Sequence, residues 1–448
     1  MRRSLFGLLC GLGVLALNLS ACHSSLPSTP RPSSTAPAKR PIPTVVQAVA
    51  PAASTPVSGV SASMPALTPV TTNGVSPAPS LNIHPDWINP LPAEFRIPEP
   101  ELLDPPTFQT PRGRWVASEW GALPGWGQDN LVEVWPALLR SCERPHPVWR
   151  IACQMAHSVD RRDEIEVRAF FHTWLRPWRV ETFDGQTTGM MTGYFEPFLE
   201  ASRVPTRRFS IPLYGPPADL GQRKPWYSRA QIDTLASAQA ALRGREIAWL
   251  ADPIDALVLH IQGSGRLMLQ EPDGQTHLVR MAFAGHNEQP YQSVGRWLVE
   301  QGAFTLEQAS WSAIRAWARD NPWRVREMMA ANPRYVFFRE EALPNPNVGP
   351  SGAQGVPLTP GRSIAVDRDS IPYGTPVWLA STEPSMGRSH GPNGPAPRPL
   401  QRMVVAQDTG GAIVGAVRAD YFWGWGSPAE DSASRTKQPL RLWAIWPR

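Results

Sequence analysis

Acidic residues are missing from the beginning of this chain of 448 residues. None occurs before Asp86, whereas residues 1–80 contain five of the 43 lysines and arginines. These five cations equal the formal net charge of +5, so residues 81–448 are neutral overall. Proteins that bind nucleic acids neutralise phosphates with a local excess of Lys and Arg. The charge distribution therefore disfavours a nucleic-acid partner, and we predict none.

Common catalytic and cofactor motifs are missing as well. The sequence has no HExxH zinc motif, no GxSxG nucleophile elbow and no phosphate-binding loop. The segment Gln262-Gly263-Ser264-Gly265 resembles an elbow, but a glutamine occupies the position of its first glycine. We therefore predict no cofactor, and a serine hydrolase is disfavoured.

The apolar run from Leu5 to Leu19 is shorter than the about 20 residues that a membrane-spanning helix needs. It follows two arginines and ends in Leu19-Ser20-Ala21-Cys22, which is typical of a bacterial lipoprotein signal. We predict that residues 1–21 are removed and that lipid on Cys22 anchors the protein to a membrane. Because His23 and not Asp follows the cysteine, the periplasmic face of the outer membrane is the expected location. An ordinary secretory signal with an incidental cysteine is the alternative.

Residues 22–80 contain no aromatic and no acidic residue and consist mainly of Pro, Ala, Ser, Thr and Val. Such a composition cannot bury enough apolar surface to fold, and its prolines favour an extended chain. We interpret this segment as a disordered tether that carries a domain away from the membrane.

Only four cysteines are present, and Cys142 and Cys153 are the two that follow the tether. In an exported protein such a pair is expected to form a disulfide. Together with His146 and His157 the same cysteines could instead form a zinc site, but the spacing is much shorter than in a usual zinc finger. We favour the disulfide and predict no metal.

Helical patterns are expected early in residues 81–448. Asp129-Asn130 is placed to cap an apolar pattern that begins at Leu131, and a second pattern runs over Asp160–Trp178. A later helical pair begins with a capping box at Thr305–Gln308 and continues from Asn321-Pro322.

Short apolar or β-branched segments bounded by Gly, Pro or Asn dominate the remainder. The predicted strands are Thr188–Phe198, Ala256–Gln262, Arg334–Arg339, Thr375–Leu379, Met403–Gln407 and Leu440–Trp446. The fold class is therefore mainly β with a helical N-terminal part, a combination that favours barrels.

All 19 tryptophans follow residue 86. Aromatic rings stack on the apolar faces of sugars, so this enrichment is compatible with a glycan groove, although most of the rings are expected in the core. Trp423 and Trp425, which lie among glycines, are the expected exceptions.

Three aspartates near the C-terminus have distinctive surroundings. Asp367 lies in AVDRDSIPYGT, Asp408 in AQDTGGAI and Asp420 in RADYFWGWG. Asp408 ends an apolar strand and enters a Thr-Gly-Gly turn, whose glycines let a ligand approach the backbone. A single aspartate at a strand end usually binds local amides, but three such sites close together favour an active site.

These three blocks resemble the three-aspartate (3D) signature of the membrane-bound lytic murein transglycosylase A family. Further blocks similar to that family occur upstream in the same order: Thr192–Pro197, Ile211–Tyr214, His260–Gly265, Ala284–Asn287, Pro290–Gly295 and Asn332–Phe338. The resemblance extends from about residue 115 to the end of the chain.

The resemblance implies a double-psi β-barrel domain with a second, smaller β-barrel domain inserted into it. On this sequence, residues 81–197 would hold the helical region and the first part of the double-psi barrel. Residues 198–331 would form the insert, and residues 332–448 the second part. Glycan strands of peptidoglycan would lie in the groove between the two domains.

The resemblance also implies site residues. Asp408 is carried over as the catalytic residue, with Asp367 and Asp420 as supporting acids. The candidate substrate-binding residues are Thr192, Gly193, Tyr194, Gln262, Ser264, Tyr291, Gly410, Gly411 and Trp423.

The implied enzyme is a carbon-oxygen lyase that acts on a polysaccharide. It would cleave the β-1,4 bond between MurNAc and GlcNAc, leave 1,6-anhydromuramoyl ends, and serve cell-wall turnover and remodelling. Cell-wall enzyme complexes remain open as further partners. The alternatives are a non-catalytic peptidoglycan-binding lipoprotein and a glycan hydrolase on the same barrel. A hydrolase needs a second carboxylate, for which Glu196 is a candidate.

Overall fold

The computed structural model describes residues 105–306, 308–384 and 397–448, which fall within one compact unit that spans Arg96–Arg448. The expected signal peptide, the lipidation site at Cys22 and the tether lie outside the described residues. Within those three ranges, no helix is both long enough and apolar enough to cross a membrane.

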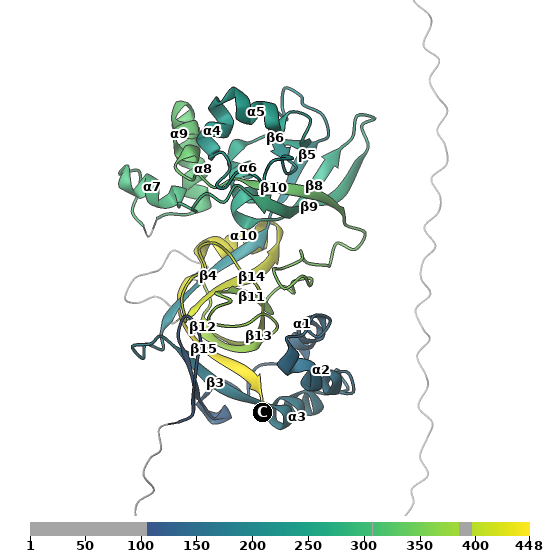
Figure 1. The fold of residues 1–448 in the computed structure, drawn as a ribbon, viewed down its shortest axis with the longest axis vertical. Helices are drawn as coiled ribbons and strands as arrows, with labels where there is room; N and C mark the ends of the chain where they lie inside the picture. Colours follow the sequence, from purple (N-terminus) through teal and green to yellow (C-terminus); the bar gives the residue numbers. More distant parts are fainter. Residues whose placement is uncertain (1–104, 307, 385–396) are drawn as a thin grey trace, which may run out of the picture. The chain divides into compact units, whose positions relative to one another are not determined.

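The first sheet has nine strands and forms a nearly closed barrel (Figure 1). Its strands run in the order β1-β2-β3-β15-β12-β13-β11-β14-β4, and β15 also pairs with β4, so the last six strands form a ring. Within the ring, β11 pairs with β13 and β14 pairs with β4 in parallel. The bounds are β1 Thr107–Gln109, β2 Arg114–Ala117, β3 Leu175–Glu181, β4 Gly189–Glu196, β11 Ser363–Val366, β12 Pro376–Thr382, β13 Pro399–Asp408, β14 Arg418–Trp425 and β15 Lys437–Pro447.

The second sheet has six strands in the order β10-β9-β8-β5-β7-β6 and lies in the insert. Its bounds are β5 Phe198–Ser202, β6 Ile211–Tyr214, β7 Glu246–Leu250, β8 Gly265–Gln270, β9 Thr276–His286 and β10 Val336–Ala342. Strand β10 pairs with β9 along its whole length, so it belongs to this sheet although it follows residue 331, the expected end of the insert. In the described residues β10 and β6 are the two ends of this strand order and do not pair with each other.

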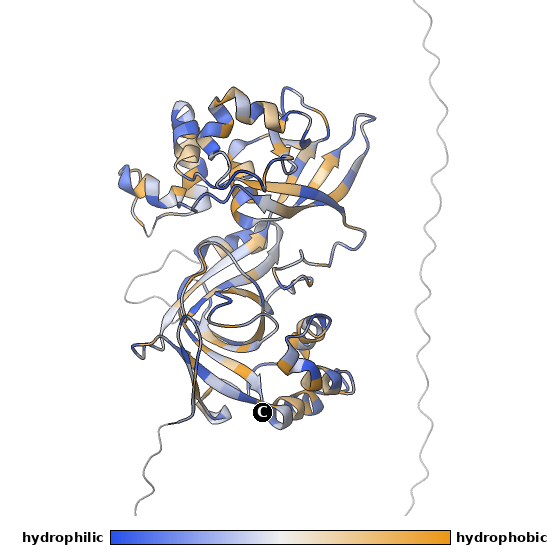
Figure 2. Cartoon of the chain, viewed as in Figure 1, coloured by the Kyte–Doolittle hydropathy of each residue, from blue (hydrophilic) through white to orange (hydrophobic). Residues whose placement is uncertain are grey.

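The helices fall into three groups along the chain. The helices that precede β3 are α1 Trp135–Ser141, α2 Arg150–Ala156 and α3 Glu164–Trp174. The helices between β6 and β10 are α4 Arg229–Thr234, α5 Ala236–Leu242, α6 Pro253–Gln262, α7 Val294–Glu300, α8 Trp311–Asp320 and α9 Val325–Ala330. The helix that follows β14 is α10 Gly426–Arg435. Figure 2 shows hydrophobic and hydrophilic residues interspersed in these helices, as expected of helices that bury one face. A disulfide between Cys142 and Cys153 joins the end of α1 to α2.

Strand β13 illustrates why the sequences of the barrel strands are continuous apolar runs. Side chains alternate along a strand, so Val404 and Ala406 lie in the core of the barrel. Met403 and Val405 point the other way and pack in the core that holds α1–α3. Both faces are therefore buried, and each buried valine contributes about 1.5–3 kcal/mol.

The prediction of a strand over Ala256–Gln262 was wrong, because this segment lies in helix α6. Asp252 caps the helix by accepting a hydrogen bond from the amide of Ile254 at 2.8 Å, and Pro253 occupies the first turn. Gly263 ends it with a φ of 80°. The apolar run itself has no clear helical or strand period, so these capping residues at its two ends determine that it forms a helix.

The predicted helix over Asp160–Trp178 was too long. Asp163 caps α3, which ends at Trp174, and the chain then enters β3 at once. The late helical pair is confirmed in α8 and α9, although Ser310 and not Thr305 caps α8.

A buried ion cluster joins the two sheets. The Glu196 carboxylate at the end of β4 is fully buried. It accepts a hydrogen bond from Arg266 of β8 at 2.7 Å and one from Arg280 of β9 at 2.5 Å. Both arginines also donate to the carbonyl of Val348. A carboxylate held in this way is not available as a catalytic base, which removes the role considered for it in a hydrolase.

We expect Glu196→Gln to lower the free energy of unfolding by about 3–5 kcal/mol, because two buried guanidinium groups would lose their counter-charge. Urea unfolding followed by tryptophan fluorescence measures this loss. The control is Glu200→Gln, which removes an exposed pair with Arg208 and should cost less than about 1 kcal/mol. Similar losses in the two variants would contradict the importance of the cluster.

Candidate active site

Two adjoining hollows form a groove between residues of the barrel and residues of the insert. The Asp408 hollow has a volume of about 660 Å³, and the Asp420 hollow, which contains Thr192 and Asp420, has a volume of about 440 Å³. The residues that line both are Tyr194, Gln262, Gly263, Phe283, His286, Arg334, Thr409, Gly410 and Gly411. Because the hollows share one wall, the groove is continuous from Asp408 to Asp420.

Asp408 is the last residue of β13, and its half-buried carboxyl group faces the groove. The Tyr194 hydroxyl donates a hydrogen bond to Oδ2 at 3.1 Å, and the amide of Ala353 donates one to Oδ1 at 2.9 Å. Burial is the main cause that raises the pKa of Asp408 to about 6, and the nearby Asp420 acts in the same direction. The hydrogen bonds oppose this shift because they favour the carboxylate.

A buried hydrogen-bond network fixes the strand just before Asp408. The side-chain amide of Gln407 donates to the hydroxyl of Ser141 at 2.8 Å and to the carbonyl of Ala137 at 2.9 Å, both in α1. The Ser363 hydroxyl donates to the Gln407 amide oxygen at 2.5 Å. Since Gln407 and Ser363 are fully buried, this network holds the end of β13 rigidly against α1.

Asp420 lies on β14 opposite Thr192 of β4. The Thr192 hydroxyl donates to the Asp420 carboxyl at 2.6 Å and accepts from Arg418 at 2.8 Å. Burial raises the pKa of Asp420, whereas the Thr192 hydrogen bond and the Arg418 charge lower it. The Asp420 carboxyl group is thus hydrogen-bonded to Thr192, whereas one side of the Asp408 carboxyl group faces the open groove.

Asp367 lines neither hollow. Its carboxylate is buried and accepts hydrogen bonds from the amides of Gly415 at 2.9 Å and Asp369 at 3.1 Å. Arg112 approaches it at 3.4 Å. These contacts hold the turn that follows Asp408. Asp367 therefore binds backbone amides and does not line the groove.

Gln262, Ser264 and Tyr291 all line the groove. The Gln262 side chain also accepts a hydrogen bond from the amide of Phe195 at 3.0 Å, which ties the end of α6 to β4. Ser264 lies in the Asp408 hollow and Tyr291 in the Asp420 hollow. Burial and the Asp420 charge raise the pKa of Tyr291, so its hydroxyl stays protonated and can donate a hydrogen bond.

Trp423 was expected in the groove but lines neither hollow. Its indole donates to the hydroxyl of Thr436 at 2.9 Å and packs among buried residues. A Cβ atom on Gly193 would lie 2.6 Å from the Trp423 indole nitrogen, so this close packing requires a glycine there. Trp425 likewise lies outside the groove and stacks under Arg266 at 3.8 Å.

Sequence reasoning missed several groove residues. The half-buried Arg334 donates from Nε to the carbonyl of Gln289 at 3.0 Å, and burial lowers its pKa. Its guanidinium group lies against Gly411, where a Cβ atom would be only 2.3 Å away. Arg334 and His286 do belong to conspicuous sequence blocks. Ala353 had no signal at all, because it acts through its backbone amide.

The described residues contain no group of three or more His, Cys, Asp or Glu that is arranged to hold a metal ion. The sulfurs of Cys142 and Cys153 are bonded to each other at 2.01 Å, with their Cα atoms 5.4 Å apart. The zinc set considered for these cysteines is therefore not formed.

Comparisons with known proteins agree with this geometry. Residues 190–339 match the model of the MltA specific insert domain, and residues 362–446 match that of the 3D domain. Membrane-bound lytic murein transglycosylase A of Escherichia coli (strain K12) is 32% identical over 269 residues, which cover 60% of this chain and 68% of that protein. The chain belongs to the membrane-bound lytic murein transglycosylase A family. The corresponding protein of Vibrio cholerae is 33% identical, over 58% of this chain and 66% of its own length.

Solved structures of the family share the fold. The lytic transglycosylase LtgG of Burkholderia pseudomallei is 43% identical with a TM-score of 0.52, over 77% of this chain and 98% of that one. MltA of Neisseria gonorrhoeae is 29% identical with a TM-score of 0.63, over 77% and 95% of the two chains. MltA of E. coli with bound chitohexaose is 26% identical with a TM-score of 0.57, over 76% and 96%.

We expect Asp408→Asn to stabilise the protein above pH 7. The pKa of Asp408 is about 6 when folded against an ordinary value of 3.8, so its contribution to stability is complete below pH 4 and is lost as the pH rises through 6. Asparagine cannot ionise, so the melting temperature of the variant should exceed that of the parent by about 2–6 °C at pH 8 and match it near pH 4.

Calorimetry at the two pH values measures this difference. The exposed Asp431→Asn on α10 is the control and should leave both melting temperatures unchanged. A gain in the Asp408 variant that is equal at pH 4 and pH 8 would show that burial does not destabilise the carboxylate.

Proposed function

We propose that this chain is a lytic transglycosylase that cleaves the β-1,4 bond between MurNAc and GlcNAc in peptidoglycan and leaves a 1,6-anhydromuramoyl end. One observation carries the proposal. Among the described residues that line the groove, Asp408 and Asp420 are the only carboxylates, and Asp420 is bound to Thr192. The insert wall offers Gln262, Ser264 and His286 but no acid. A hydrolase would need a second carboxylate across the groove, about 5–9.5 Å from the first.

In the first step Asp408 acts as the acid. Its raised pKa keeps a substantial fraction of the carboxyl group protonated near pH 6. The proton passes to the bridging oxygen as the bond from that oxygen to C1 of the muramoyl residue breaks. The GlcNAc hydroxyl leaves, and positive charge develops at C1 beside the new Asp408 carboxylate.

In the second step the same carboxylate acts as the base. It accepts the proton of the muramoyl C6 hydroxyl as that oxygen attacks C1 and closes the 1,6-anhydro ring. One proton has been given and one taken, so Asp408 returns to its starting state without water or a cofactor. Tyr194 and the amide of Ala353 hold the carboxylate between the two steps.

We assign the remaining candidates to supporting roles. Asp420 contributes charge near Asp408 and holds Thr192, while Asp367 positions the turn after Asp408 through Gly415. Tyr194, Gln262, Ser264 and Tyr291 would contact the glycan, with Gly410 and Gly411 leaving room beside Arg334. Support for a β-linked sugar ligand comes from the related E. coli MltA, which has been solved with bound chitohexaose.

We also propose a double-psi barrel for the first sheet and a location at the outer membrane. The ring of six strands with two parallel pairs supports a double-psi barrel, with the insert dividing its two parts. The curated relatives are named membrane-bound, which supports attachment to a membrane. Lipid on Cys22 and the tether of residues 22–80 would place the groove at the periplasmic face of the outer membrane, within reach of peptidoglycan and of cell-wall enzyme complexes.

Asp408→Asn should reduce glycan cleavage at least about 1,000-fold, because the variant has no group to give or take the proton. Mass spectrometry of products from purified peptidoglycan separates anhydro ends, which are one water lighter, from reducing ends. The parent protein should yield anhydro ends only. Reducing ends would indicate a hydrolase, and intact strands would indicate a binding protein.

Tyr194→Phe should move the alkaline limb of the pH profile of kcat/KM upward. The tyrosine hydroxyl favours the ionised Asp408, so its removal raises the pKa of Asp408 and keeps the acid protonated to higher pH. The expected shift is about 0.5–1 pH unit, because such a hydrogen bond contributes about 0.5–1.5 kcal/mol. Tyr214→Phe, in β6 of the insert, is the control. An unmoved or lowered limb in the Tyr194 variant would argue against Asp408 as the acid.

A further inference from the structure

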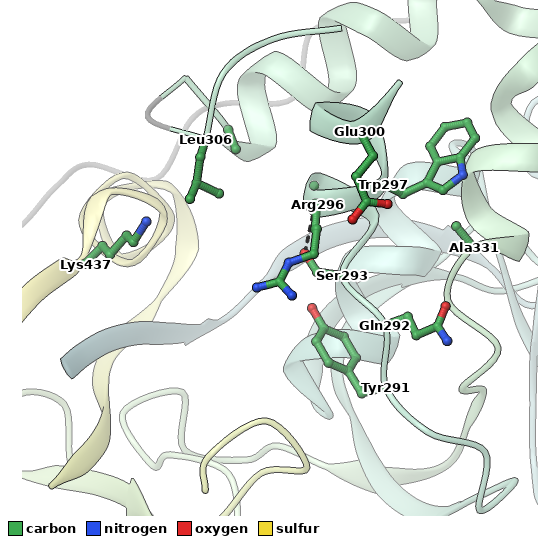
Figure 3. A pocket seen from close by; sticks show the side chains of 11 residues that line it. Tyr291, Gln292, Ser293, Arg296, Trp297, Glu300, Leu306, Ala331 and Lys437 are labelled. Atoms are coloured by element: carbon green, nitrogen blue, oxygen red, sulfur yellow. Dashed lines mark hydrogen bonds between the residues drawn. The ribbon is translucent and has the colours of Figure 1, made fainter. Parts of the chain in front are cut away.

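A third hollow continues the groove beyond Asp420. This basic hollow has a volume of about 720 Å³ and is lined by residues that include Tyr291, Ser293, Arg296, Glu300 and Lys437 (Figure 3). Tyr291 lines both the basic hollow and the Asp420 hollow. A strand of sugars in the groove could therefore pass from Asp408 along Asp420 into the basic hollow.

The register of the barrel places the basic hollow on the same face as the aspartates. Asp420 of β14 pairs with Thr192 of β4, and Thr192 pairs in turn with Lys437 of β15. Paired residues of neighbouring strands project from the same face of a sheet. Since neighbouring strands lie about 4.8 Å apart, the backbone of Lys437 is about 10 Å from that of Asp420.

The basic hollow carries an excess of positive charge. Lys437 from the barrel and Arg296 from α7 are both exposed, and neither has an ion-pair partner among the described residues. Glu300 is the one acid in the lining, so these groups sum to a single positive charge. Figure 3 shows Arg296 and Tyr291 pointing toward one another, with the amine of Lys437 on the opposite side of the hollow. One cation thus comes from strand β15 of the barrel and the other from helix α7, and both line the same hollow.

We propose that the basic hollow binds a carboxylate carried by the substrate, an inference that rests on the proposed function. The N-acetylated sugars of the glycan are neutral and give these cations nothing to pair with. The negative groups of peptidoglycan are the free carboxylates of the stem peptides and, where the peptide has been removed, the lactyl carboxylate of muramic acid. Either would be held by Lys437 and Arg296, with the Tyr291 hydroxyl as a further donor.

Binding to three soluble ligands tests this proposal in the uncleaving Asp408→Asn background. The ligands are a glycan fragment with stem peptides, the same fragment stripped of peptide by an amidase, and chitohexaose, which has no carboxylate. Calorimetry compares the dissociation constants with those of added Lys437→Gln, Arg296→Gln and both together. The double change should weaken binding of a carboxylate-bearing ligand about 10-fold at low salt and less at high salt, and leave chitohexaose unaffected.

The pattern of losses identifies the carboxylate. A loss confined to the peptide-bearing fragment assigns the hollow to the stem peptide, a loss confined to the stripped fragment assigns it to the lactyl group, and a loss with both shows that either is accepted. Equal losses with all three ligands, or none, would overturn the proposal. Arg150→Gln, an exposed cation on α2, is the matched control. These are binding measurements, so they stand apart from the anhydro-product assay that tests the proposed function.

Discussion

The buried Glu196 carboxylate is the constraint on which the groove depends. It ends β4, the strand that also carries Thr192 and Tyr194, and it is held by Arg266 and Arg280 of the insert. The same arginines hold the carbonyl of Val348, a few residues before the amide of Ala353 that binds Asp408. One ion cluster therefore connects the two walls of the groove with the loop beside Asp408.

Hydrogen-bond partners and access to the groove distinguish Asp408 from Asp420. Both are surrounded by protein, which raises the pKa of each. The Asp420 carboxyl group accepts a hydrogen bond from the Thr192 hydroxyl and lies near the positive charge of Arg418. Asp408 keeps one side open to the groove, with its position set by Tyr194, by Ala353 and by the Gln407 network behind it. This difference in position and hydrogen bonding supports the acid–base role that we propose for Asp408.

Much of the fold could be predicted because the local signals agreed with the tertiary structure. The runs Met403–Gln407 and Leu440–Trp446 lie in β13 and β15, where burial on both faces requires continuous apolar residues. The prediction failed at Ala256–Gln262, where a similar run forms α6 because Asp252 and Gly263 supply its ends. Apolar runs of this length do not distinguish a strand from a buried helix, and only the flanking caps decide.

The sequence alone indicated the family, Asp408 as a candidate catalytic residue and the pairing of the two cysteines. Each of these depends only on contiguous residues or on a simple spacing. The sequence could not determine which aspartates face the groove, because that depends on strand register and on contacts between residues more than 200 positions apart, such as Tyr194 with Asp408. The tertiary structure therefore placed Asp367 in a turn and Trp423 in the core. It also placed Lys437 of the barrel and Arg296 of α7 in the lining of one hollow, and the pairing of β4 with both β14 and β15 aligned Lys437 with Thr192 and Asp420.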